Sequence, residues 1–207
     1  MATFVLIHGA GDVGWYWHLV EAELRALGHD TVAPDLPCDD DSAGLTEYTD
    51  AVVTAIGDRT GGLVVVGQSL GGFTAPLVCE RVPVDRLVLV APMIPAPGEA
   101  VTDYFTDTGY VDVSSDDPFY QDVPAELKAE ARRRGRAQSE ARLGEPTPMR
   151  EWPAVPTRVV ICRDDRLFPP DYLRRVARER LGVTPVEIDG GHTPALSRPR
   201  TLAHCLR

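Results

Sequence analysis

At 207 residues the chain has the length of a single domain, and it is long enough to bury a sizeable hydrophobic core. Its composition, 43% hydrophobic and 25% charged, is that of a globular protein and excludes a disordered or fibrous one. The net charge of −10 argues against nucleic acid or an anionic membrane surface as a partner, because both attract clustered positive charge.

The beginning of the chain and its cysteines predict a compartment. The first residues run directly into a short apolar stretch with no basic segment before it, so no secretory signal is predicted. No apolar run reaches the roughly 18 residues that indicate a membrane span. The four cysteines are far apart and form no C-x-x-C pair, which favours free thiols over a disulfide framework or a zinc site. We therefore expect a cytoplasmic protein, whose oligomeric state the sequence leaves open.

Apolar runs and helical patterns alternate along the chain. Buried strands are predicted over residues 3–8, 29–37, 63–68, 85–92, 157–165 and 184–191. Helices are predicted over residues 15–28, 45–58, 70–82, 169–182 and 199–207, with Thr46 as the N-cap of the second. Repeated strand–helix–strand units predict an α/β fold, a mostly parallel sheet of about six strands with helices on both faces. Sites in such sheets lie beyond the carboxyl ends of the strands.

The alternation breaks between Pro92 and Pro156. Residues 124–143 have a mostly helical pattern, and an insertion this long between two strands is rarely an idle loop. We interpret residues 93–155 as a small helical cap on a single domain that spans residues 1–207, with a plain surface excursion as the alternative. Acidic residues are interleaved with the basic ones over residues 128–142, which favours a solvated helix face over a binding patch.

A G-x-S-x-G motif, Gly67 to Gly71, lies between a predicted buried strand and a predicted helix. A tight turn there forces Ser69 into a strained conformation that projects its hydroxyl from the sheet, and the two glycines let the turn close. The helix begins just beyond, so the N–H of Leu70 can point at a developing oxyanion. The motif therefore predicts that Ser69 is a nucleophile.

A nucleophilic serine needs a base, and His192 is the best candidate among the five histidines. It follows the sixth predicted strand, at the sheet edge where Ser69 also lies. His8 also ends a strand, but Gly9 and Ala10 follow it, which suits a loop that lends a second amide to an oxyanion hole. The other three histidines are better placed for structural or solvated positions.

The base needs a carboxylate to orient it, and Asp164 and Asp165 end the fifth predicted strand. The order serine, aspartate, histidine along the chain is the one expected for a nucleophile elbow. Either aspartate satisfies that order, and an N-cap pair for the next helix is the alternative for both.

These stretches resemble the α/β-hydrolase superfamily, and more narrowly its small methylesterase and hydroxynitrile-lyase branch. The matching segments are residues 4–11, 67–72, 162–170 and 189–199. In that branch a proline follows four residues after the acid, so aligning on Pro169 selects Asp165. The resemblance places the oxyanion-hole amides at Ala10 and Leu70. It implies an esterase-like serine hydrolase with a catalytic triad of Ser69, His192 and Asp165 and with no metal or organic cofactor.

The expected reaction is hydrolysis of a small-molecule ester through an acyl-enzyme. No basic residue stands out near the predicted site, which favours a neutral carboxylic ester. Thioesterase and lactonase activities use the same machinery and stay open. Related hydroxynitrile lyases carry a lysine where this chain has Thr193, so cyanohydrin cleavage is disfavoured. A non-catalytic or ligand-binding protein on the same fold is one alternative, and a lyase or cofactor-independent oxygenase that relies on His192 and Asp165 is another.

Aromatic side chains and a methionine are the candidates for an apolar pocket beneath the cap. They are Trp15, Trp17, Met93, Tyr104, Phe105, Tyr110, Phe119 and Tyr120. For Trp15 and Trp17, packing of the first helix against the sheet is the alternative.

Overall fold

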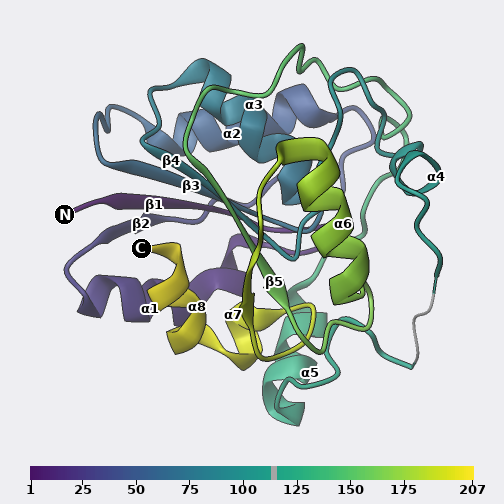
Figure 1. Ribbon diagram of the computed structural model, residues 1–207. Coiled ribbons are helices and arrows are strands. Elements are labelled where there is room, and N and C mark those ends of the chain that lie inside the picture. The colour runs from purple at the N-terminus through teal and green to yellow at the C-terminus, as the bar shows by residue number, and fades with distance from the viewer. Residues whose placement is uncertain (113–115) are drawn as a thin grey trace.

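The six predicted strands form one parallel sheet. The computed structural model describes residues 1–112 and 116–207, so three residues of the expected cap lie outside the described residues. The strands are β1 (Thr3–Ile7), β2 (Asp30–Val32), β3 (Leu63–Gln68), β4 (Arg86–Val90), β5 (Thr157–Cys162) and β6 (Val186–Ile188). Their order is β2-β1-β3-β4-β5-β6, and all neighbouring pairs are parallel (Figure 1). The predicted fold class is confirmed.

Helices cover both faces because the strand side chains alternate between them. Val5 and Ile7 of β1 join one hydrophobic cluster, and Phe4 and Leu6 join the other. The first cluster is covered by α2 (Leu45–Ile56), α3 (Gly71–Arg81) and α6 (Pro170–Leu181). The second is covered by the 3-10 helix η1 (Gly14–Trp17), α1 (His18–Ala26), α7 (Pro194–Ser197) and α8 (Pro199–Leu206). Figure 1 shows α2 and α3 above the sheet and α1, α7 and α8 below it.

The long connection between β4 and β5 contains the helices α4 (Tyr104–Asp107) and α5 (Ala125–Arg134). The prediction of a mostly helical segment over 124–143, with its solvated helix face, is therefore wrong beyond Arg134. Arg136 N–H donates to the Gly11 carbonyl at 2.8 Å, and a Cβ on Gly135 would lie 3.1 Å from that oxygen. Contact with a loop that is distant in sequence thus ends the helix, and the local sequence pattern could not predict that contact.

The start of α2 differs from the expected one. Gly44 occupies the N-cap position, and its N–H donates to the Glu47 carboxylate at 2.8 Å. Thr46, the expected N-cap, lies inside the first turn. The acid that bonds back to the N-cap is three residues after Gly44, which is the spacing of a capping box.

The loops that follow β1 and β3 lie at a topological switch point. These strands are neighbours, but the chain leaves β1 for one edge of the sheet and β3 for the other. Crevices at such points commonly bind ligands, and the loops here begin with His8 and Ser69. Among residues 1–112 and 116–207, no helix is long and apolar enough to cross a membrane.

Candidate active site

Ser69 lies in a strained turn between β3 and α3. Its φ is +51°, in the left-handed region that side-chain-bearing residues rarely adopt. The end of β4 and the loop after it hold the turn: Ser69 N–H donates to the Val90 carbonyl at 3.1 Å, and the Ser69 carbonyl accepts from Met93 N–H at 3.0 Å. The strain is therefore maintained by the sheet and keeps the hydroxyl at its carboxyl edge.

Close contacts require glycine on both sides of this turn. A Cβ on Gly67 would lie 2.6 Å from the Gly71 carbonyl oxygen, and a Cβ on Gly71 would lie 2.8 Å from that of His8. A Cβ on Gly72 would lie only 2.0 Å from the Met93 carbonyl oxygen. Helix α3 can therefore start directly against β1 and β3 only because these positions lack side chains.

His192 and Asp165 form a continuous hydrogen-bonded chain with Ser69. His192 Nε2 lies 3.1 Å from Ser69 Oγ, and His192 Nδ1 lies 2.9 Å from Asp165 Oδ2. A carboxylate only accepts, so Nδ1 carries the hydrogen and Nε2 accepts the serine hydroxyl. All three side chains are buried. The structure thus brings together the three residues that the sequence singles out, in the arrangement that acyl-transfer chemistry requires.

Of the two adjacent aspartates, Asp165 is the one that contacts His192. Its Oδ1 accepts from two backbone N–H groups of the following turn, each at 2.9 Å, and these bonds fix the carboxylate. Asp164 Oδ2 accepts from Gly190 N–H at 3.2 Å and so ties the end of β5 to the loop that carries His192. One aspartate therefore orients the ring, and the other holds the loop.

The two expected oxyanion-hole residues, Ala10 and Leu70, both line the cavity that Ser69 faces. Within the described part of the chain, neither backbone N–H donates to a protein acceptor. Both donors are therefore free to bind a carbonyl oxygen that develops negative charge beside Ser69.

His8 holds the loop that carries Ala10. Its Nδ1 lies 2.8 Å from the Gly9 carbonyl, and its Nε2 accepts from Leu36 N–H at 3.0 Å. Burial lowers the pKa of His8 to about 4, so the ring is neutral at neutral pH and can donate at one nitrogen while it accepts at the other. His8 is a positioning residue for the Gly9-Ala10 turn, which agrees with its expected place outside the catalytic chain.

An apolar cavity of about 530 Å³ opens beside Ser69, and its volume suits a small organic molecule. Four of the predicted lining residues do line it: Met93, Phe105, Tyr110 and Phe119. The others are Ala10, Leu70, Val101, Asp112, Gln138, Glu140, Leu143, Leu167 and Phe168. None of these described lining residues is a lysine or an arginine. Among the described residues, no group of three or more His, Cys, Asp or Glu side chains could hold a metal ion.

Four of the predicted lining residues lie elsewhere. Trp17 is fully buried against the sheet, and Trp15 stacks on the His18 ring with centroids 4.2 Å apart. Tyr104 is buried in the hydrophobic cluster on the other face of the sheet from the two tryptophans. Tyr120 lines a second, smaller cavity instead. The packing alternative for the two tryptophans is therefore correct.

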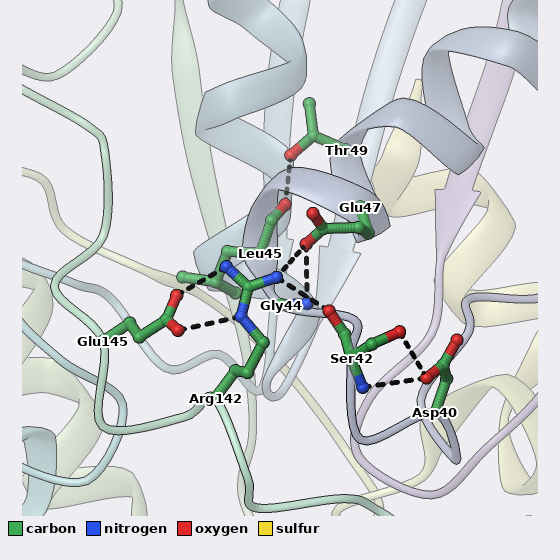
Figure 2. Close-up of polar contacts among 8 residues, drawn as sticks. All are labelled: Asp40, Ser42, Gly44, Leu45, Glu47, Thr49, Arg142 and Glu145. Atoms are coloured by element: carbon green, nitrogen blue, oxygen red, sulfur yellow. Dashed lines mark hydrogen bonds and ion pairs between the residues drawn. The ribbon is translucent and has the colours of Figure 1, made fainter.

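Arg142 fastens the lining segment 138–143 to the rest of the molecule. Its guanidinium donates to the Ser42 carbonyl at 2.8 Å and to the Glu47 carboxylate at 2.9 Å, and it is paired on its other edge with Glu145 (Figure 2). Because Glu47 also caps α2, the bond connects one wall of the cavity to a helix of the main sheet.

A six-stranded parallel sheet with a strained serine at its switch point defines the α/β-hydrolase class of fold. The family model described as alpha/beta hydrolase family matches residues 4–204, so the chain belongs to that family.

Several of the similar proteins carry esterase names. A probable esterase of Oryza sativa subsp. japonica is 39% identical over 107 residues, which cover 46% of this chain and 41% of the relative. Methylesterase 7 of Arabidopsis thaliana is 31% identical over 104 residues, which cover 44% of this chain and 40% of the relative. The chain therefore spans about two fifths of the length of these curated relatives. The crystal structure of polyneuridine aldehyde esterase matches the fold with a TM-score of 0.86 at 21% identity, over 100% of this chain and 98% of that one.

Proposed function

We propose that this protein is a serine hydrolase that cleaves a small, neutral carboxylic ester through an acyl-enzyme. The observation that carries the proposal is the bonded chain from Asp165 through His192 to Ser69, which ends at a strained serine beside an apolar cavity. The esterase names of the similar proteins support the same reaction class. In this proposal residues 93–155 act as a cap within a single domain.

In the first half-reaction Ser69 Oγ attacks the ester carbonyl while His192 Nε2 takes its proton. Asp165 holds the ring in the productive tautomer and stabilises its charged form. The amides of Ala10 and Leu70 stabilise the oxyanion, an effect typically worth about 3 kcal/mol for a strong donor. His192 then gives the proton to the departing alcohol, and the acyl group stays on Ser69.

The lining of the cavity supports a neutral substrate. Its described walls are mainly aliphatic and aromatic, and the carboxylates among them are those of Asp112 and Glu140. A substrate with a free carboxylate is disfavoured, because none of these described lining residues is a lysine or an arginine that could bind it. An uncharged acyl group of moderate size fits the volume.

The test is hydrolysis of a p-nitrophenyl ester series by wild type and Ser69→Ala, followed by intact-mass measurement after a fluorophosphonate probe. We expect kcat/KM to fall by about 10³-fold or more in Ser69→Ala and the single probe adduct to disappear. Ser42→Ala, which removes an exposed serine hydroxyl that is hydrogen-bonded to Asp40, is the matched control. It should keep the wild-type kcat/KM and the single probe adduct.

The other outcomes separate the competing functions. Appreciable activity in Ser69→Ala would favour a lyase or oxygenase that uses His192 and Asp165. A folded wild type that neither hydrolyses the esters nor gains an adduct would favour a non-catalytic, ligand-binding protein. Faster turnover of thioesters or lactones than of esters would keep the mechanism and change the substrate class.

A further inference from the structure

A second cavity, which we call the small chamber, adjoins the large one at the nucleophile. It has a volume of about 30 Å³, enough for a single water molecule. Its lining residues are Gly9, Ala10, Asp12, Gln68, Ser69, Phe119, Tyr120, His192 and Thr193. Ala10, Ser69 and Phe119 also line the large cavity. The two cavities therefore meet at the atoms where acyl transfer would occur.

The two cavities differ in which catalytic groups they contain. Ser69 lines both, whereas His192 lines only the small chamber. A small molecule held in the small chamber can therefore exchange a proton with His192. The large apolar cavity is left for the acyl group.

Asp12 is the one carboxylate among the described residues that line the small chamber. Its Oδ1 accepts from Val13 N–H at 3.0 Å. Within residues 1–112 and 116–207, its Oδ2 has no hydrogen-bond partner. The titratable groups around it are the phenols of Tyr16 on η1 and Tyr120 in the β4–β5 connection, together with His192. No lysine or arginine is among the chamber's described lining residues.

Two other polar side chains of the chamber, Gln68 and Thr193, are already engaged. Gln68 Nε2 donates to the His192 carbonyl at 3.3 Å, and Thr193 Oγ1 donates to the Phe119 carbonyl at 2.6 Å. Burial raises the pKa of Asp12 to about 6, so the carboxyl is mainly ionised at pH 7 and acts as an acceptor. Asp12 Oδ2 is thus the strong acceptor that the chamber offers to a small molecule.

We propose that the small chamber binds the water that hydrolyses the acyl-enzyme and that Asp12 is its positioning residue. The inference rests on the proposed function. The water oxygen attacks the acyl carbonyl carbon and gives one proton to His192 Nε2, while its second O–H donates a hydrogen bond to Asp12 Oδ2. The bond from the carbonyl carbon to Ser69 Oγ then breaks, and His192 returns the proton to Oγ. Asp12 gains and loses nothing; it fixes the direction from which the water approaches.

The experiment measures attack by water separately from acylation. A p-nitrophenyl dimethylcarbamate transfers its carbamoyl group to a reactive serine and releases p-nitrophenol, and slow hydrolysis of the adduct restores activity. We compare full-length wild type, Asp12→Asn and Asp39→Asn by the rate of p-nitrophenol release, by intact mass and by the rate of recovery. Asp39 is an exposed acid outside both cavities, so Asp39→Asn controls for the loss of one negative charge.

We expect Asp12→Asn to be carbamoylated within about twofold of the wild-type rate and to recover at least tenfold more slowly. In the variant the amide oxygen can keep the bond from Val13 N–H, which leaves an NH₂ donor in place of the acceptor. With p-nitrophenyl acetate, kcat and KM should fall together while kcat/KM, which reports acylation, is unchanged. Asp39→Asn should match wild type in every rate.

Each other outcome overturns the inference. If carbamoylation and recovery slow equally in Asp12→Asn, the carboxylate maintains the site as a whole. If recovery is unchanged, Asp12 has no part in the attack by water. Asp12→Ser keeps a short acceptor for Val13 N–H, so it serves as a second variant should the first not fold. It must likewise be carbamoylated at a near wild-type rate and recover more slowly. A wild type that accepts no carbamoyl group at all contradicts the proposed function itself.

Discussion

Two ionisable residues of the loop after β1 have pKa values displaced in opposite directions by the same cause. Burial lowers the pKa of His8 to about 4 and raises that of Asp12 to about 6. In both cases the charged form is disfavoured because few water molecules reach the group. His8 is neutral at neutral pH, and its two hydrogen bonds use that state. Asp12 is mainly ionised there, so the folded protein carries a charge that burial opposes.

The charge on Asp12 predicts a stability cost. Between its ordinary pKa of 3.8 and about 6, the folded state keeps a proton that the unfolded state has lost, so this residue's contribution to stability falls as pH rises through that window. Asp12→Asn removes the effect and should raise the free energy of unfolding at pH 7 by about 2 to 3 kcal/mol.

Urea unfolding at pH 7 and at pH 4 measures this difference. The higher free energy of unfolding of Asp12→Asn should disappear near pH 4, where Asp12 of the wild type is largely protonated in the folded state. Protonation of His8 destabilises wild type and variant alike and cancels in the comparison. A variant less stable than wild type at pH 7 would mean that the carboxylate contributes more through its bond to Val13 than its burial costs.

At the scale of elements, the position of the nucleophile depends on how closely α3 begins beside the sheet. Gly71, the first residue of the helix, meets the backbone of β1 and of His8 without any intervening side chain. Pro76 lies inside the same helix and cannot donate a backbone hydrogen bond, so α3 lacks one of its internal hydrogen bonds. The helix is buried along its first two turns, where loss of this contact would be felt most.

Gly71→Ala should therefore displace the elbow as well as destabilise the fold. Its Cβ would lie 2.8 Å from the His8 carbonyl oxygen and 2.9 Å from that of Ile7, and backbone atoms in a sheet cannot move aside easily. We expect a loss of about 1 to 3 kcal/mol in the free energy of unfolding and a loss of the proposed esterase activity. Gly144→Ala is the control, since its nearest contact is a hydroxyl 3.8 Å away, and it should be within about 0.5 kcal/mol of wild type. Equal effects in the two variants would show that close approach at Gly71 is not limiting.

Across the whole molecule, the sequence predicts what depends on local pattern and misses what depends on distant contact. The six strands are evident because buried parallel strands are continuous apolar runs, and Ser69 is evident because its turn has a fixed motif. Leu167 and Phe168 lie two and three residues after Asp165, so the sequence offered a usable signal for their place in the cavity wall. No local pattern in the sequence predicts that Gln138 and Leu143 line the cavity, because contacts with other loops determine the conformation of the segment that carries them.

Those contacts attach the β4–β5 connection to the main sheet at its return segment, residues 136–145. Arg136 N–H donates to the Gly11 carbonyl at 2.8 Å, Gly11 N–H donates to Gln138 Oε1 at 3.2 Å, and Ser139 N–H donates to the Cys38 carbonyl at 2.7 Å. The loop that carries the oxyanion-hole candidate Ala10 is therefore bonded to the cavity wall. We therefore expect opening of residues 136–145 and disorder of the loop that carries Ala10 to be coupled.

Arg142→Met tests this coupling by removing the attachment to Ser42 and Glu47. Because Arg142 is partly exposed, its ion pairs should contribute little to global stability, yet local opening of residues 136–145 needs only a small change in free energy. We expect amide hydrogen exchange in this segment to accelerate fivefold to tenfold and KM to rise, with little change in the melting temperature. Arg133→Met removes ion pairs to Glu130 within α5 alone and is the matched control. If exchange in residues 136–145 were the same in both variants, the attachment through Arg142 would not hold the wall closed, and the backbone bonds to Gly11 and Cys38 alone would have to account for its position.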